Sequence, residues 1–263
     1  MISVIMSCFN EESKVTRAVN SILNQTYTDF EFIICDDCSK DNTYQVLCEL
    51  AKKDSRIIVL KNEENLRLSK SLNKCRKIAK GEYIARMDAD DISESNRFKE
   101  QVKFLDSNPE YAFCGTTITL FDESGTWDNR VLQEVPTNKS FLSTSPFVHP
   151  SIVFRKECLF DVGLYTEKNI GRAEDYELFA KLYSKGYKGY NIQENLFNYY
   201  ESKQSYKKRT WKAAFQEIPV RNRIYKMLKL YPRAFIYLFK PVIVKLMPYK
   251  IRLFFHKKAI KSK

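Results

Sequence analysis

Glycine and proline are scarce in this chain, with 7 and 8 occurrences among 263 residues. This scarcity excludes collagen-like and low-complexity classes of protein. Long apolar runs are absent from the C-terminal part, where the longest uncharged stretch, AFIYLF (234–239), ends at Lys240. A membrane-spanning helix needs roughly 20 apolar residues, so this part predicts none.

A disulfide framework and a secretory leader are also missing. The 7 cysteines are an odd, scattered set, which is typical of reduced, partly buried thiols. Cys35 and Cys38 have C-x-x-C spacing, but zinc would need a second pair and a redox site a helix start, so we interpret them as incidental thiols. The N-terminus has no basic region and no cleavage site, which predicts a cytoplasmic chain.

Enough apolar material is present for a sizeable core. Hydrophobic residues make up 44% of the chain and aromatic residues 14%, which argues against wholesale disorder. Charge is distributed unevenly, because residues 203–263 hold 18 Lys or Arg and a single acid, Glu217, whereas the preceding 202 residues carry a net charge of −5. We therefore expect a mildly acidic body over 1–202 and a separate basic tail over 203–263.

Strand and helix patterns alternate through the first hundred residues. Apolar, β-branched runs predict strands at 3–9, 30–37, 56–62 and 82–88. Apolar residues at helical spacing predict helices at 11–25, 39–53 and 67–81. Ser39 is the expected N-cap of the second helix, and Gly81 the end of the third. This alternation predicts an α/β fold with a mostly parallel central sheet flanked by helices.

Polar residues follow three of these strands, at Ser7 to Asn10, at Asp36-Asp37 and at Asp88 to Asp91. In an open α/β sheet, ligands bind beyond the carboxyl ends of the strands. We therefore expect these side chains to converge on one functional edge.

The stretch ARMDADD (85–91) places three carboxylates in four positions, where each raises the pKa of the others. Asp88-x-Asp90 with Asp91 offers hard oxygen ligands that suit Mg²⁺ or Mn²⁺, although an isolated motif fits a solvated turn equally well. Its place after a fourth parallel strand favours the metal. Neither G-x-G-x-x-G nor G-x-x-x-x-G-K-[ST] occurs, so a metal rather than a backbone cradle would neutralise bound phosphates.

The pattern changes beyond residue 96. We expect a helix at 97–109, a strand at 111–121, a polar loop over 122–140 and a helix at 173–186. Asp175 lies at the start of the last helix, where an acid also favours the positive end of the helix dipole. His149 is one of only two histidines, and a lone histidine is commonly a hydrogen-bonded structural group.

The tail over 203–263 interleaves Lys and Arg with large apolar residues. This pattern predicts a basic, amphipathic, helical appendage that lies in the membrane interface and is attracted to anionic lipids. A basic face packed on the body and a nucleic-acid-binding arm are the alternatives. The many Phe, Leu, Ile and Val residues suit lipid better than a phosphate backbone.

Five stretches, in this order along 1–200, resemble the bacterial family 2 glycosyltransferases, which are inverting enzymes with a GT-A fold. They are ISVIMSCFNEE, FEFIICDDCSKDNT, NLRLSKSLNKCRKIAKGEYIARMDADD, HPSIVFRKE and EDYELFAKL. The full ordered set is far more specific than any one motif.

The resemblance implies roles for the residues at the first strand ends. Ser7, where the family often has Pro, and Asn10 would line the nucleoside pocket of a nucleotide-diphosphate sugar. Asp37 would contact the base. Asp88 would reach the ribose or the metal, and Asp90 would be the main metal ligand.

The later stretches would supply the chemistry. By the same resemblance, Asp175 would be the catalytic base and Glu174 would shape the site beside it. His149 would lie near the donor site, where a metal or diphosphate role is an alternative to a structural one. Arg67 and Cys75 stand where the family usually has Gly, and Arg67 either adds positive charge near the diphosphate or is tolerated on a loop.

An inverting transfer needs a carboxylate that takes the proton of the attacking hydroxyl and a Mn²⁺ or Mg²⁺ ion that stabilises the leaving nucleoside diphosphate. Its transition state has oxocarbenium character, and no covalent nucleophile is required.

The resemblance implies transfer of a hexosyl or N-acetylhexosaminyl group, with a UDP-sugar as the expected donor. The acceptor would be a lipid-linked glycan of bacterial surface polysaccharide or capsule synthesis. The tail would attach the enzyme to the inner face of the plasma membrane, with no nucleic-acid partner. The alternative is a nucleotide-fold binding module with a basic arm for nucleic acid.

Overall fold

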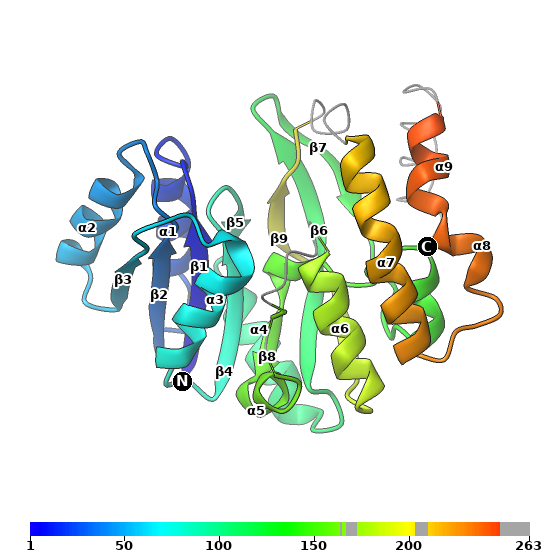
Figure 1. The fold of residues 1–263 in the computed structure, drawn as a ribbon. Coiled ribbons are helices and arrows are strands. Elements are labelled where there is room, and N and C mark those ends of the chain that lie inside the picture. The colour runs from blue at the N-terminus through cyan, green and yellow to red at the C-terminus, as the bar shows by residue number, and fades with distance from the viewer. Residues whose placement is uncertain (164, 167–172, 203–209, 248–263) are drawn as a thin grey trace.

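The computed structural model describes residues 1–163, 165, 166, 173–202 and 210–247. Its centre is a nine-stranded sheet with strand order β3-β2-β1-β4-β8-β6-β9-β5, and β7 pairs with β6. Helices cover both faces of the sheet (Figure 1). The predicted α/β class is therefore confirmed.

The first half of the sheet is parallel, as predicted. Its strands are β1 (Ile2–Cys8), β2 (Phe30–Asp36), β3 (Ile57–Lys61) and β4 (Tyr83–Asp88). The helices between them are α1 (Val15–Leu23), α2 (Thr43–Lys53) and α3 (Arg67–Ile78). Since β1 lies between β2 and β4, with helices on both faces, all its residues except Ser7 are buried.

Alternate side chains of each strand enter two separate cores. Val4 and Met6 of β1 join the apolar residues of α1, α2 and α4 on one face, whereas Ile5 joins those of α3, α6 and α7 on the other. The buried positions of α1 are those that its helical spacing predicts, namely Val15, Ala18, Val19 and Ile22.

The second half of the sheet is mixed. Its elements are β5 (Ile92–Ser93), α4 (Arg97–Ser107), β6 (Phe113–Asp122), β7 (Gly125–Arg130), β8 (Val153–Arg155), α5 (Lys156–Asp161), α6 (Glu174–Ser184) and β9 (Gly189–Tyr200). β8 runs antiparallel to both β4 and β6, while β6 and β9 are parallel. The sheet is thus parallel on the side of β1–β4 and mixed beyond β4.

The two predicted helix caps, Ser39 and Gly81, are wrong. α2 begins at Thr43 rather than after Ser39, because the Ser39 hydroxyl instead accepts a hydrogen bond from the backbone N–H of Asn10 at 3.0 Å. α3 ends at Ile78, and Gly81 does not cap it. Gly81 serves a close approach, since a Cβ there would lie 2.5 Å from the backbone nitrogen of Ser3.

The predicted loop over 122–140 is correct only for residues 123, 124 and 131–137. It contains β7 and the 3-10 helix Asn138–Leu142. The polar residues of β7 follow from its place at the edge, because only β6 pairs with it and most of its side chains remain accessible. Polar composition alone therefore did not separate an edge strand from a loop.

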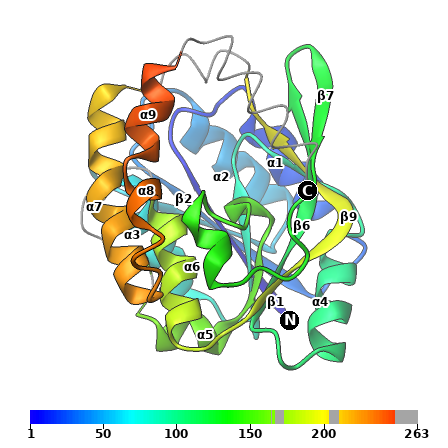
Figure 2. The ribbon, with the colours of Figure 1, turned by 90° about the vertical axis from the view of Figure 1, so that its right-hand side faces the viewer.

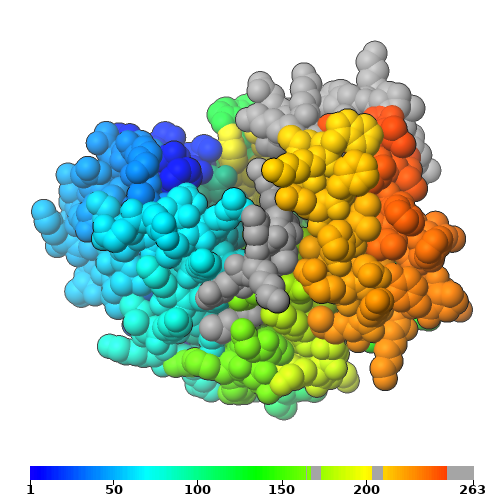
Figure 3. All heavy atoms as spheres, viewed as in Figure 1, coloured from blue at the N-terminus to red at the C-terminus, as the bar shows by residue number. Residues whose placement is uncertain are grey.

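The described part of the basic tail is helical, with α7 (Trp211–Met227), α8 (Phe235–Leu238) and α9 (Lys240–Leu246). These helices form one side of the molecule, opposite β3 and α2 (Figures 1 and 3). α7 packs along α6 and buries Val220, Ile224 and Tyr225 in the same core as α3 and α6. Residues 203–209 and 248–263 lie outside the described residues.

Some of the positive charge of this tail is used within the protein. Arg221 pairs with Glu217 at 2.7 Å, Arg223 pairs with Glu177 of α6 at 2.9 Å, and the Lys240 ammonium donates to the backbone carbonyl of Ser143 at 3.1 Å. None of the described helices is long and apolar enough to cross a membrane. The division at residue 202 stays a prediction.

The packing of α7 can be tested with two matched substitutions. Ile224→Ala removes a fully buried side chain and should lower the free energy of unfolding by about 2–5 kcal/mol. Ile236→Ala makes the same chemical change at a side chain that is 77% exposed, and it should change stability by less than about 0.5 kcal/mol. Urea denaturation measures both, and equal effects would show that α7 does not belong to the core.

Candidate active site

The polar strand ends meet at one edge of the sheet, as the sequence predicts. Strand register pairs Ser7 of β1 with Cys35 on one side and with Asp88 on the other. Ser7 is partly exposed there. The adjacent Asn10 has a positive φ of 57°, and its Oδ1 accepts the backbone N–H of Lys40 at 2.8 Å. This hydrogen bond thus links the segments that follow β1 and β2.

Asp37 is buried and fixed by four hydrogen bonds. Its Oδ1 accepts from Asn62 at 2.7 Å, from the backbone N–H of Leu66 at 2.8 Å and from the Ser71 hydroxyl at 3.0 Å. Its Oδ2 accepts from the backbone N–H of Arg67 at 2.8 Å. Asp37 therefore shapes the segment that leads into α3, and its contact with a base stays a prediction.

Arg67 begins α3 with a φ of +67°, in the left-handed region that favours glycine. This explains physically why glycine suits the position. The arginine side chain is exposed at the functional edge of the sheet. Its approach to a diphosphate stays a prediction.

Asp88 is paired with an arginine that the sequence reasoning missed. The Arg86 guanidinium is fully buried, and its Nη2 lies 2.5 Å from Oδ1 of Asp88, whose side chain is 30% exposed. A charged residue inside an otherwise apolar strand, two positions before Asp88 and so on the same face, was the available indication.

Asp90 lies among other negative charges. Burial, together with Asp88 and Glu11, raises the pKa of Asp90 to about 7. Burial also raises the pKa of Glu11, with Asp88 contributing. Lys14, 3.7 Å from Glu11, partly offsets this charge, and Arg17 donates to the backbone carbonyl of Asp90 at 3.0 Å. Glu11 was a further member that sequence reasoning did not name.

Asp91 has a different environment from Asp88 and Asp90. It is fully buried, and its Oδ1 accepts the backbone N–H of Tyr200 at 2.7 Å. This hydrogen bond ties the end of β9 to the acidic loop. Burial and the charges of Asp88 and Asp90 raise the pKa of Asp91 well above its ordinary value.

His149 lies on a short 3-10 helix (His149–Ser151) that packs on β4. Its Nε2 is 2.6 Å from the hydroxyl of Tyr165, and both side chains are buried. Burial and the nearby charge of Arg86 keep the pKa of His149 well below its ordinary value, so the ring is neutral. A metal or diphosphate role for His149 stays a prediction.

Asp175 and Glu174 occupy the first turn of α6. Burial, Glu174 and Asp88 raise the pKa of Asp175 to about 7. The N-terminus of the helix offsets this rise only in part. Since Asp88 contributes to this shift, Asp175 lies within electrostatic reach of the ends of the parallel strands. Residues separated by 87 positions in the sequence are thus electrostatically coupled.

Hard oxygen donors in this site suit a divalent cation. Asp88 and Asp90 offer carboxylates whose mutual repulsion a cation would relieve. Within the described parts of the chain, no set of three or more His, Cys, Asp or Glu side chains is arranged to hold a metal. A cation here would therefore take most of its ligands from phosphate oxygens and water, as Mg²⁺ commonly does.

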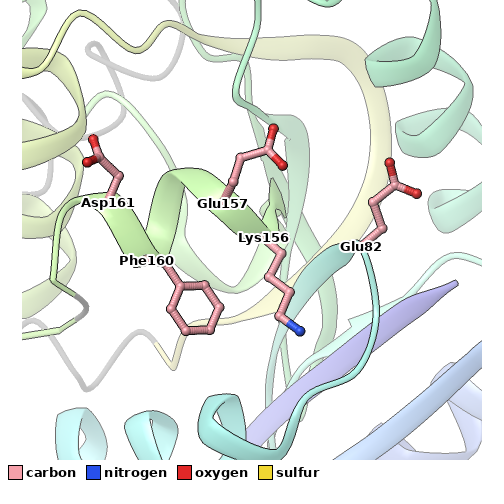
Figure 4. A pocket seen from close by; sticks show the side chains of 5 residues that line it. All are labelled: Glu82, Lys156, Glu157, Phe160 and Asp161. Carbon is pink, nitrogen blue, oxygen red and sulfur yellow. The ribbon is translucent and has the colours of Figure 1, made fainter.

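A separate hollow of about 660 Å³ lies next to α5. Lys156 and Phe160 point to the same side of this helix, and Glu82, just before β4, lies beyond Lys156 (Figure 4). Glu82 precedes the first residue of β4, whereas Asp88 ends that strand. This hollow is therefore at the wrong end of the sheet for the predicted site.

The fold and the acidic edge together are those of a GT-A glycosyltransferase. A model of glycosyl transferase family 2 matches residues 3–162. The putative glycosyltransferase EpsE of Bacillus subtilis (strain 168) is 34% identical over 98% of this chain and 94% of its own length. The chain therefore belongs to glycosyl transferase family 2.

Other similarities agree with this assignment. The Escherichia coli UDP-Gal:alpha-D-GlcNAc-diphosphoundecaprenol beta-1,3-galactosyltransferase is 28% identical over 98% of this chain and 96% of its own length. Staphylococcus aureus TarS 1-349, solved with UDP-GlcNAc, has a TM-score of 0.71 at 21% identity over 86% of this chain and 66% of its own. The Pyrobaculum calidifontis mannosyltransferase PcManGT, solved with GDP-Man and Mn²⁺, has a TM-score of 0.68 at 16% identity over 98% of this chain and 79% of its own.

The environment of Asp175 predicts a pH-dependent effect on stability. Its folded-state pKa is raised, so its ionisation costs stability progressively as the pH rises from about 4 to about 7. Asp175→Asn should therefore stabilise the fold by up to about 4 kcal/mol at pH 8 and by little at pH 4.

Asp54→Asn is the matched control of opposite sign. Arg56 holds the pKa of Asp54 below its ordinary value, so this change should destabilise at pH 7 and lose its effect in acid. Denaturant titrations at several pH values measure both. A destabilising Asp175→Asn at pH 8 would contradict the half-buried, charge-repelled environment.

Proposed function

We propose that this glycosyltransferase moves a hexosyl or N-acetylhexosaminyl group from a UDP-sugar to a hydroxyl of a lipid-linked glycan, with inversion, in bacterial surface polysaccharide synthesis. The observation that supports this proposal is the place of Asp88, which pairs with Ser7 at the carboxyl end of β4 and whose charge contributes to the raised pKa of both Asp90 and Asp175. The names of the E. coli relative and of the TarS complex support the donor, and the former also supports the acceptor.

Asp175 is suited to act as the base. Its pKa of about 7 makes it a stronger proton acceptor than an ordinary carboxylate, while a large fraction is still ionised near neutral pH. In this scheme Asp175 takes the proton from the acceptor hydroxyl as the hydroxyl oxygen attacks the anomeric carbon. Glu174, beside it, adds negative charge that keeps this pKa high.

The opposite part of the site would bind the donor. Ser7 and Asn10 would border the nucleoside, Asp37 would recognise the base, and Arg67 would approach the diphosphate. Asp88 and Asp90 would hold Mn²⁺ or Mg²⁺, which when bound supplies positive charge to the leaving diphosphate. The Mn²⁺ in the PcManGT structure supports a metal of this kind.

Removal of the base gives the direct test. Asp175→Asn should lower the rate of sugar transfer by at least about 100-fold, because the amide cannot accept the proton. The affinity for UDP in the presence of Mn²⁺, obtained from the rise in melting temperature with UDP concentration, should stay within twofold of wild type.

Asp161, an exposed carboxylate paired with Lys185, provides the control, and Asp161→Asn should retain full activity. Wild-type rates in Asp175→Asn would refute the assignment of the base. A wild-type protein that no nucleoside diphosphate stabilises, with or without metal, would refute the proposed function.

Attachment to an anionic membrane is the second part of the proposal. Exposed apolar side chains follow one another along α8 and α9, with Phe235, Ile236, Phe239, Ile243 and Leu246 each at least 44% exposed. Lys212, Lys226, Lys229 and Arg233 add exposed positive charge on α7 and on the segment that follows it. Apolar residues flanked by basic ones suit a bilayer with anionic headgroups.

The position of these helices fits a lipid-linked acceptor. The first turn of α7 and the last turn of α9 lie at the same end of the molecule as the carboxyl ends of β1 and β2 (Figures 1 and 2). A bilayer bound along α8 and α9 would therefore lie beside the acidic site rather than behind the sheet. A nucleic-acid arm is less well supported, because the surface of these helices is apolar as well as basic.

Substitutions test this attachment better than truncation, because removing residues after 202 would also remove the buried face of α7. Ile236→Ser with Leu246→Ser should weaken binding to phosphatidylglycerol-containing vesicles by at least about tenfold. Phe160→Ser, at a 54% exposed side chain on α5, should leave vesicle binding unchanged. Unchanged vesicle binding of the double variant, or tighter binding of wild type to duplex DNA than to vesicles, would contradict the proposal.

A further inference from the structure

Arg86 is a fully buried cation in the middle of the sheet. It lies in β4 between Ala85 and Met87, which are both core residues, and it pairs across the sheet with Ile5 of β1. A buried charge without a partner is costly, by several kcal/mol in proteins. An apolar residue would fill a central strand at no such cost, so the position of Arg86 calls for an explanation beyond the fold.

The partner of Arg86 is a residue of the donor site. Side chains two positions apart on a strand share a face, so Arg86 and Asp88 project to the same side of β4. Nη2 of Arg86 donates to Oδ1 of Asp88 at 2.5 Å, while Nη1 donates to the backbone carbonyl of Met87. The guanidinium is therefore anchored both to the carboxylate and to the strand that bears it.

This arrangement gives the two carboxylate oxygens of Asp88 different surroundings. One oxygen accepts from a completely buried group, whereas the Asp88 side chain as a whole remains 30% exposed. A carboxylate held at one oxygen by a fixed guanidinium loses rotational freedom, and its other oxygen is left for a ligand. The arginine also influences the groups around it, since it helps to keep His149 neutral.

We propose that Arg86 is a positioning residue of the donor site, which fixes Asp88 so that a single carboxylate oxygen, Oδ2, faces the nucleotide sugar. The inference rests on the proposed function, in which Asp88 contacts the donor or its cation. Arg86 itself, being buried beneath Asp88, does not touch the substrate. Its contribution is to hold that oxygen in place before the donor arrives.

Arg97 of α4 offers a matched control. It is equally buried, and it donates to the backbone carbonyl of Arg86 at 2.9 Å and to Oε1 of Gln101 at 2.9 Å. Its hydrogen bonds thus support the same strand without engaging the Asp88 carboxylate. A purely structural role for Arg86 would make substitutions at the two arginines equivalent.

Calorimetric binding of UDP, with Mn²⁺ and with a chelator, separates these roles. Arg86→Met should weaken Mn²⁺-dependent UDP binding at least tenfold and raise the KM for the donor more than it lowers kcat. Arg86→Lys, which keeps the charge but not the planar fork, should recover part of this affinity. Arg97→Met should lower the melting temperature to a similar extent but leave UDP affinity within twofold of wild type.

A double-mutant cycle completes the test. In an Asp88→Asn background, Arg86→Met should have no further effect on UDP affinity, because the carboxylate that it positions is gone. Equal UDP affinity of wild type and Arg86→Met, or equal losses of UDP affinity in Arg86→Met and Arg97→Met, would overturn this inference but not the proposed function. If Arg86→Met does not fold, Arg86→Lys with wild-type affinity would overturn it. A wild-type protein that binds no nucleoside diphosphate would instead refute the proposed function, and the inference with it.

Discussion

Repulsion between carboxylates is the constraint on which the rest of this site depends. Glu11, Asp88, Asp90, Asp91 and Asp175 come from three parts of the chain, and the charge of Asp88 contributes to the raised pKa of each of the other four. Bringing these groups together costs free energy, which the two apolar cores on either side of the sheet must supply. A fold optimised for stability alone would not gather them.

The protein offsets part of this repulsion with different partners for different carboxylates. Asp88 receives the buried guanidinium of Arg86, Asp91 the backbone N–H of Tyr200, and Asp175 the N-terminal end of α6. Asp90 keeps a pKa of about 7 despite the nearby Lys14. The remaining demand for positive charge is therefore centred on Asp90, where the family resemblance implies the main metal ligand.

Much of the fold could be predicted because apolar periodicity is a local property. The four parallel strands and the helices α1, α3, α4 and α6 lie within a few residues of their predicted bounds. The strands β7 and β9 were missed, because an edge strand carries polar side chains and because β9 pairs with residues some 75 positions earlier. The start of α2 was misplaced since a contact between Ser39 and Asn10 decided it.

The sequence by itself determined the α/β class, the three polar strand ends and the identity of the acidic motifs, because each of these depends on neighbours along the chain. Only the tertiary structure decided which carboxylates face one another, that Asp91 is a structural tie, and that Arg86 lies beneath Asp88. It also decided that α7 belongs to the core rather than to a free basic arm. The physical reason is that charge interactions and burial depend on which residues are close in space, and many of these residues are far apart in the sequence.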